Sequence, residues 1–342
     1  MRKLLNTLYI TNEDYYLGCQ GENIIIKLDG KIIRRFPIHI LEDIVTFNYV
    51  GVSPALIKLC NEHKISLTFL TPSGNFCGKF IGKTNGNVLL RREQYRIADD
   101  ERALQCAKWM IEAKLINSRK NYLRLMNDHK KRLDSLEEIQ IACDKIKENV
   151  LSIPAVTTSD ELRGIEGDGA RTYFQLFDSL ILHQKEDFKF VFRSRRPPLN
   201  RVNAALSFLY SLLTHEVQSA LETVGLDSYV GFFHTDRPGR AGLALDMMEE
   251  LRAYLVDRLV VSLINRKQIK AADFEVKENS AVLLNDDGRT KVINAWQKRK
   301  QQEIKHPYLK EKISIGLIPY VQAQLLARYI RGDIDYYPAF IS

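Results

Sequence analysis

The segment Lys83-Thr-Asn-Gly-Asn87 divides the chain into two parts with different sequence patterns. Before it, short runs of β-branched and aromatic residues alternate with turn residues, which is the pattern of β-strands. After about Asp99, apolar residues recur every three to four positions, the spacing of helices that bury one face. We therefore predict an α+β protein with an N-terminal β-sandwich-like domain over 1–87, a linker over 88–98 and a larger all-α domain over 99–342.

The first part contains seven predicted strands and one helix. The strands fall at 5–11, 15–19, 23–28, 31–37, 43–50, 65–70 and 76–81, separated by turn signals such as Asp29-Gly30. Ser53 followed by Pro54 predicts the start of a helix that ends near Glu62, with serine as the N-cap and proline in the first turn. Short strands at this spacing are typical of a sandwich.

Composition limits the class of protein. The 342 residues include 50 Lys and Arg against 42 Asp and Glu, and the net charge of +8 favours a polyanionic partner, although ordinary solvated charge is the alternative. The five cysteines form no Cys-x-x-Cys pair, which argues against a disulfide framework or a zinc cage and fits a reducing compartment. No run approaches the roughly 18 apolar residues of a membrane span, and the start lacks a signal sequence. We expect a cytoplasmic protein with no membrane association.

A glutamate among glycines stands in the segment Arg163-Gly-Ile-Glu-Gly-Asp-Gly-Ala-Arg171. Thr158, with Glu161 three residues later, predicts a capping box that starts this helix. Each glycine costs a helix roughly 1 kcal/mol relative to alanine, so close approach of another group to this backbone is expected. Glu166 lies beside the apolar stripe of the helix, where an unpaired carboxylate is costly, and we expect a cation beside it.

A second group of chemically active side chains begins at His234, which opens His-Thr-Asp-Arg-Pro-Gly-Arg240. A helix follows, and its buried stripe leaves Asp246, Glu249 and Glu250 on another flank at three-to-four spacing. Like charges so placed repel each other unless a cation lies between them, which suggests a divalent metal. Two simpler interpretations stay open: a solvated acidic patch at a helix start, and a histidine packed in the core.

Two carboxylates and one imidazole suit Mg²⁺ or Mn²⁺ acting on a phosphodiester. The sequence contains no Walker loop, His-Glu-x-x-His, Gly-x-Ser-x-Gly or dinucleotide-binding motif that would support other chemistry. Arg193-Ser-Arg-Arg196 leads into Pro197-Pro198, where the chain is extended, so phosphate contact is expected of Arg193, Arg195 and Arg196. Arg237 and Arg240 are expected to contact DNA as well.

Three stretches resemble one known family: 164–170, 196–210 and 234–252. They are similar to the CRISPR-associated spacer-acquisition nuclease, the first of the Cas proteins, and the resemblance covers the whole chain. The ending, residues 322–338, resembles the subtype I-C branch. The resemblance implies a cytoplasmic, metal-dependent DNA endonuclease and integrase that joins prespacer 3′-hydroxyl ends to a CRISPR repeat by transesterification.

The resemblance also implies site residues and partners. The metal ligands fall on Glu166, His234 and Glu249, with Asp246 as a supporting or alternate ligand; Glu250 stays open as the third ligand, although helix phase favours Glu249. Family members resemble homodimers joined through their β domains, and two dimers flank a dimer of the small companion protein, Cas two, in a heterohexamer that binds double-stranded DNA. For Asn203, Tyr210 and Tyr173, core packing and substrate contact are both possible roles.

Two other functions stay open at this point. A stand-alone nuclease of branched DNA would use the same metal chemistry. A non-catalytic DNA-binding scaffold would leave the acidic residues at the surface and use the arginine stretch to hold phosphates.

Overall fold

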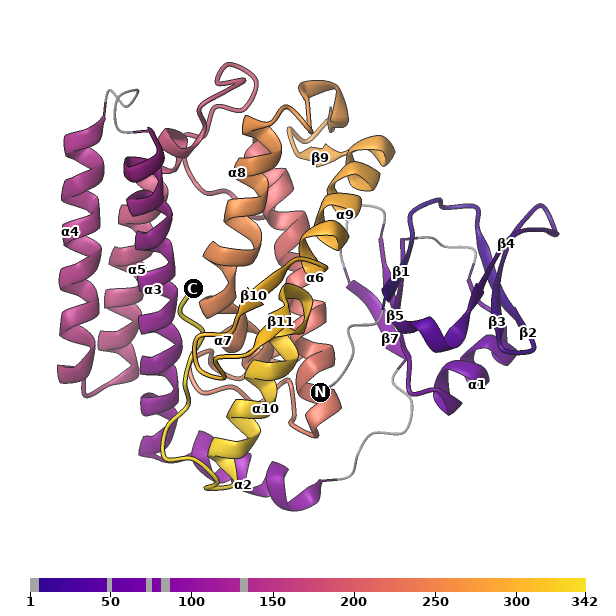
Figure 1. The fold of residues 1–342 in the computed structure, drawn as a ribbon, viewed down its shortest axis with the longest axis horizontal. Coiled ribbons are helices and arrows are strands. Elements are labelled where there is room, and N and C mark those ends of the chain that lie inside the picture. Colours follow the sequence, from indigo (N-terminus) through magenta and orange to yellow (C-terminus); the bar gives the residue numbers. More distant parts are fainter. Residues whose placement is uncertain (1–5, 48–50, 72–75, 81–86, 130–134) are drawn as a thin grey trace.

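The structure is a computed structural model that describes residues 6–47, 51–71, 76–80, 87–129 and 135–342. It consists of an N-terminal β domain beside a larger helical domain (Figure 1). This order of a β-rich part followed by a mostly helical part confirms the predicted fold class. Among the described residues, no helix is both long enough and apolar enough to cross a membrane.

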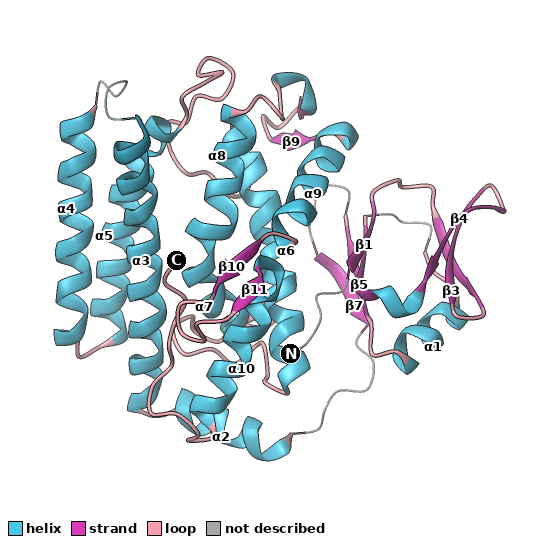
Figure 2. Ribbon diagram, viewed as in Figure 1, coloured by secondary structure: helices cyan, strands magenta, loops and turns pink. Residues whose placement is uncertain are grey.

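Two sheets form the β domain (Figure 2). The first has the strand order β1-β5-β6-β7, in which β1 pairs parallel with β5, β5 parallel with β6, and β6 antiparallel with β7. The second is an antiparallel sheet of the order β2-β3-β4. The strands are β1 (Asn6–Ile10), β2 (Tyr16–Gln20), β3 (Asn23–Leu28), β4 (Lys31–Pro37), β5 (Leu41–Thr46), β6 (Ser66–Leu70) and β7 (Phe76–Phe80).

One apolar core joins the two sheets, which confirms the sandwich-like arrangement. Leu17 and Ile24 of the second sheet pack with Ile44 and Leu67 of the first. Helix α1 (Pro54–Glu62) closes this core with Leu56, and the Ser53 side chain caps it by accepting a hydrogen bond from Leu56 N at 3.1 Å. The predicted strand ends at 48–50 and 81 lie outside the described residues.

The helical domain surrounds one long buried helix, α6 (Figure 1). Both faces of α6 carry fully buried apolar residues because α7, α10 and the β domain cover it. The helices of this domain are α2 (Val88–Ala98), α3 (Glu101–His129), α4 (Leu136–Ser152), α5 (Ser159–Gln175), α6 (Arg201–Val224), α7 (Gly242–Leu251), α8 (Arg258–Asn265), α9 (Asp286–Lys300) and α10 (Ile318–Ile330).

Three predictions about this domain need correction. The segment 88–98, predicted as a linker, is helix α2, and its buried Gln94 donates hydrogen bonds to the carbonyl oxygens of Asp227 and Val230. The domain is not all-α, because it contains two short antiparallel pairs: β8 (Phe274–Val276) with β9 (Val282–Leu284), and β10 (Glu303–Lys305) with β11 (Lys312–Ser314). The helix predicted to follow Arg240 is not continuous: it consists of α7 and α8 joined by a π-helical turn, Arg252–Asp257.

Polar contacts tie the β domain to the helical domain. Lys79 on β7 forms an ion pair with Glu222 on α6 at 2.8 Å, and both side chains are almost fully buried. Tyr9 on β1 donates to Glu216 on α6, which also receives the buried ammonium of Lys300 at 2.7 Å. These contacts fix the β domain against α6, whereas α3 and α5 lie on the opposite side of the helical domain (Figure 1).

Candidate active site

Glu166 is placed by the start of α5 and by the packing of α5 on α3. The predicted capping box is present: Thr158 Oγ1 accepts from Glu161 N at 3.2 Å, and Glu161 accepts from Thr158 N at 3.3 Å. The predicted close approach of another group to a glycine is confirmed at Gly169, because a Cβ there would collide with Leu115 of α3. At Gly164 and Gly167 the expected close approach is wrong, since a Cβ there would meet open space in the described protein.

His234 is held by a buried carboxylate. Nδ1 of His234 lies 2.5 Å from Oδ1 of Asp246, which also accepts from His234 N at 2.9 Å. The other oxygen, Oδ2, accepts from the backbone N–H groups of Phe232 at 2.6 Å and Phe233 at 2.9 Å. Asp246 is 1% exposed and takes four hydrogen-bond contacts, so it acts as an acceptor that fixes the ring. The contact places a proton on Nδ1 and leaves Nε2 as the ring nitrogen available to a metal, the orientation seen in metal-binding histidines.

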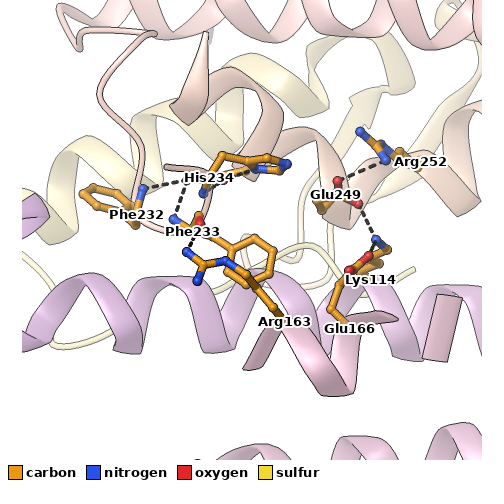
Figure 3. A network of polar contacts seen from close by, with 9 residues as sticks. Lys114, Arg163, Glu166, Phe232, Phe233, His234, Glu249 and Arg252 are labelled. Atoms are coloured by element: carbon orange, nitrogen blue, oxygen red, sulfur yellow. Dashed lines mark hydrogen bonds and ion pairs between the residues drawn. The ribbon is translucent and has the colours of Figure 1, made fainter. Parts of the chain in front are cut away.

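Glu249 lies between two cations. Its Oε1 is 3.0 Å from Arg252 and its Oε2 is 2.7 Å from the Lys114 ammonium, which also binds Glu166 Oε1 (Figure 3). Burial alone would raise the pKa of Glu249, but Arg252 and Lys114, with a smaller contribution from His234, lower it to about 2. Glu249 is therefore ionised at any physiological pH, as a metal ligand must be.

Glu250 points away from this group. Its carboxylate accepts from the Tyr337 hydroxyl at 2.6 Å, from Gln322 Nε2 at 3.1 Å and from Phe340 N at 2.9 Å, all in the C-terminal part of the chain. Burial raises its pKa to about 7. The helix turn of about 100° per residue separates the two neighbours. Glu249, and not Glu250, faces Glu166 and His234, in agreement with helix phase.

The predicted ligands share one region but do not form a closed cage. Lys114 joins Glu166 to Glu249, and Figure 3 shows the His234 ring pointing toward the side where these residues lie. Across the described ranges, no three His, Cys, Asp or Glu side chains are close enough together to hold an ion. The donor set nevertheless fits a cation, because Oε2 of Glu249 is buried without an aligned hydrogen bond, and an ammonium already lies between the carboxylates.

Burial also excludes one of the two simpler interpretations, a solvated acidic patch at a helix start. Asp246, Glu249 and Glu250 are 1%, 4% and 0% exposed, so the acidic residues are not a solvated surface patch. An unpaired carboxylate in such a place would be costly, and each of these has its own set of partners.

The predicted arginines fall into two kinds. Arg193 supports the fold: its guanidinium donates to Asn203 Oδ1 at 2.8 Å and to Ser207 Oγ at 3.1 Å. Arg195 and Arg196 are exposed, and within the described chain neither makes a hydrogen bond or an ion pair. These two can meet a polyanion without first breaking an internal contact.

Arg237 and Arg240 lie in the loop that follows His234. Arg237 is exposed and Arg240 half-buried, and neither guanidinium has an acceptor among the residues that the structure describes. Their role in DNA contact stays a prediction.

A cleft of about 410 Å³ opens beside Lys114. Tyr210 lies in its wall between two guanidinium groups, with Arg193 5.4 Å and Arg252 5.1 Å from the ring centre. The hydroxyl of Tyr210 donates to Asp257 at 2.6 Å, while burial raises the pKa of Asp257 to about 6. The cleft is basic: its lining includes Lys114, Arg171, Arg193, Arg195 and Arg252.

The roles left open for three residues can now be separated. Asn203 is fully buried and binds Arg193 and the carbonyl oxygen of Phe192, so it is structural. Tyr173 is 3% exposed and donates to Asp257 at 3.0 Å, which makes it a core residue at the base of the cleft. Tyr210 is half-buried and its ring lines the cleft, where a substrate can contact it.

Sequence reasoning missed Lys114 and Arg252, the two cations that bind Glu249. Lys114 lies 52 residues before Glu166 in another helix, so no local motif links them. The available signal was a lysine on the apolar face of α3, four residues after Met110 and three after Ile111, because a buried lysine is expected to pair with a carboxylate.

Comparison of the sequence with known proteins shows the family of the chain. A family model described as CRISPR associated protein Cas1 matches residues 8–298. The chain belongs to the Cas1 family. It is 46% identical over 342 residues to a protein of Chlorobaculum tepidum named CRISPR-associated endonuclease Cas1 1, covering 100% of this chain and 99% of that one. It is 47% identical over 341 residues to CRISPR-associated endonuclease Cas1 2 of Rhodospirillum rubrum, covering 99% and 98%.

Solved structures share the Cas1 fold at lower identity. A casposase bound to integration product has a TM-score of 0.85 at 22% identity and covers 99% of this chain and 94% of that chain. A Cas6-RT-Cas1–Cas2 complex has a TM-score of 0.82 at 22% identity, covering 100% of this chain and 37% of that one. At this identity the likeness concerns the fold alone, and the subtype I-C branch stays a prediction.

Proposed function

We propose that this protein is a divalent-metal-dependent DNA endonuclease and integrase of CRISPR spacer acquisition. Membership of the Cas1 family supports the proposal, as do curated relatives named endonucleases that match along the whole chain. The observation that carries it is the arrangement of Glu166, Glu249 and His234: two carboxylates converge on one cation, beside an imidazole with a free Nε2.

Glu166, Glu249 and His234 would hold Mg²⁺ or Mn²⁺. When bound, the ion would supply activation of the attacking hydroxyl and stabilisation of the leaving oxygen. Asp246 fixes the His234 ring through Nδ1, and Arg252 holds Glu249 ionised and oriented. Each of these two residues acts on a ligand and is therefore a positioning residue.

The proposed reaction is a transesterification on DNA. A prespacer 3′-hydroxyl attacks a phosphodiester at the repeat boundary, a new P–O bond forms, and the bond to the leaving 3′-oxygen breaks. The attacking hydroxyl loses a proton and the leaving oxygen gains one, so one phosphodiester replaces another and no ATP is needed. Arg195 and Arg196 are free to hold the DNA backbone, and the basic cleft beside Lys114 continues that surface.

We also propose that the protein acts as a homodimer joined through the β domains, with the Cas two protein as its partner in a heterohexamer on double-stranded DNA. Support comes from a solved structural neighbour described as a Cas6-RT-Cas1–Cas2 complex. The net charge of +8 and the exposed arginines favour such a polyanionic substrate.

The test is the joining of a labelled DNA duplex with 3′-hydroxyl ends to a repeat-bearing plasmid, with Mg²⁺ and the companion protein. Glu166→Gln should abolish joining while its thermal unfolding stays cooperative. Asp168→Asn is the matched control, because Asp168 is on the same helix but binds Lys145 and Asn149 of α4.

The other functions predict different outcomes in the same assay. Cleavage of branched DNA without joining would indicate a stand-alone nuclease. A scaffold would bind DNA in a salt-sensitive way, and EDTA would not change the affinity. Neither wild type nor Glu166→Gln would then cleave or join DNA strands.

A further inference from the structure

Lys114 is a buried lysine with two carboxylate partners. It lies on α3 at 9% exposure, and its ammonium contacts Glu166 on α5 and Glu249 on α7. The side chain of Glu249 is 5% exposed and that of Glu166 is 24% exposed, so the contact is largely screened from water. Three helices that are distant in sequence thus meet at a single ammonium group.

Charge balance indicates what the ammonium does. Glu166 and Glu249 carry two negative charges, and Lys114 and Arg252 carry two positive charges, so the set is already neutral. Asp246 adds one negative charge beside His234, because hydrogen bonds from neutral N–H groups leave its carboxylate charged. A divalent ion added to these five groups would leave an excess of one positive charge in a buried place, which is costly unless a cation leaves.

The structure offers the ammonium a place to go. Lys114 lines the 410 Å³ cleft together with Arg171, Arg195 and Arg252. The four methylenes of a lysine side chain allow the ammonium to turn away from the carboxylates while the backbone of α3 stays in place. In the cleft it would join guanidinium groups in contact with water, and a bound anion such as a DNA phosphate would stabilise this cluster further.

We propose that Lys114 is the built-in counter-ion of the site, which occupies the cation position between Glu166 and Glu249 and leaves it for the basic cleft when a divalent metal binds. The inference rests on the proposed metal-dependent function. Lys114 is then a positioning residue in the metal-free protein, holding the two carboxylates at the separation a metal needs. Metal and ammonium exclude each other, so removal of the ammonium strengthens metal binding.

Calorimetric titration of Mn²⁺ into DNA-free protein tests this directly. Lys114→Met should bind Mn²⁺ at least about tenfold more tightly than wild type, since a competing cation is gone. Without metal the same variant should unfold at a lower temperature, and Mn²⁺ should restore more of its stability than it adds to wild type. Lys114→Arg keeps the charge and should show no tighter binding. Lys120→Met is the matched control, because Lys120 on the same helix donates to the backbone oxygen of Ser342 and contacts no carboxylate side chain among the described residues.

A second measurement needs no variant. Amine acetylation of wild type at fixed pH, read by mass spectrometry, should modify Lys114 several times faster with Mn²⁺ than with EDTA, while Lys120 stays unchanged. Unchanged labelling of Lys114 on Mn²⁺ binding, or equal or weaker Mn²⁺ binding by Lys114→Met, would overturn the inference and leave the metal-dependent function standing. If neither wild type nor Lys114→Met binds Mn²⁺, both the proposed metal-dependent function and the inference about Lys114 are wrong.

Discussion

Replacing Asp246 with asparagine would separate its positioning role from that of an alternate ligand. The carboxylate takes contacts from Phe232 N, Phe233 N, His234 N and His234 Nδ1. An asparagine oxygen can keep two of these, but its NH₂ group faces the other two donors. Two hydrogen bonds to a charged group are worth about 3–6 kcal/mol in total. In a domain of this size that lowers the unfolding temperature by about 6–24 °C.

Function should fall as well, because the His234 ring loses the charged acceptor that fixes its tautomer. We expect Mn²⁺ affinity and strand joining to drop about 10–100-fold. Differential scanning calorimetry in EDTA gives the stability change, and Mn²⁺ titration gives the affinity. Asp160→Asn is the control: its side chain is 92% exposed, and its change should stay within about 2 °C. An Asp246→Asn protein that unfolds at the same temperature as wild type and binds Mn²⁺ with the same affinity would refute the reasoning.

Three further predictions use single substitutions. Glu249→Gln should weaken Mn²⁺ binding at least about tenfold while Glu250→Gln stays within about threefold, and the reverse order in calorimetry would reassign the ligand. Burial raises the pKa of Asp43 to about 6, so the folded state binds its proton more tightly than the unfolded chain; stability should therefore fall as pH rises from about 4 to about 6. Urea unfolding across that range should show a shallower fall for Asp43→Asn, and an identical slope would contradict the assignment. Arg195→Ala should reduce the salt dependence of DNA affinity by about 0.9 in log–log slope, whereas Arg96→Ala, on α2, should not, as fluorescence anisotropy can measure.

Much of the fold could be predicted from local chemistry. The capping pair Thr158 and Glu161 and the Ser53–Pro54 helix start depend on contacts within four residues, so the sequence pattern contains them. The segment 88–98, predicted as a linker, is a helix whose Gln94 finds its acceptors more than 130 residues later. A hydrogen bond between residues so far apart in the sequence produces no local sequence pattern.

In the candidate site, too, local features could be predicted from the sequence and tertiary contacts could not. Helix phase favours Glu249 over Glu250 but leaves both open, and the structure gives the two carboxylates different partners, since neighbouring positions on a helix face different directions. The role of Asp246 as a fixed acceptor for His234 depends on a loop conformation, which periodicity does not describe. Lys114 could not be assigned to this site, because its partners lie on two other helices and only tertiary packing brings them together.

The most direct test of the central claim is the position of the metal itself, read from anomalous diffraction of crystals grown with Mn²⁺. We predict a peak within about 2.4 Å of a carboxylate oxygen of Glu166, a carboxylate oxygen of Glu249 and Nε2 of His234. A peak elsewhere at saturating Mn²⁺, with Glu166 and Glu249 lacking any bound ion, would contradict the account.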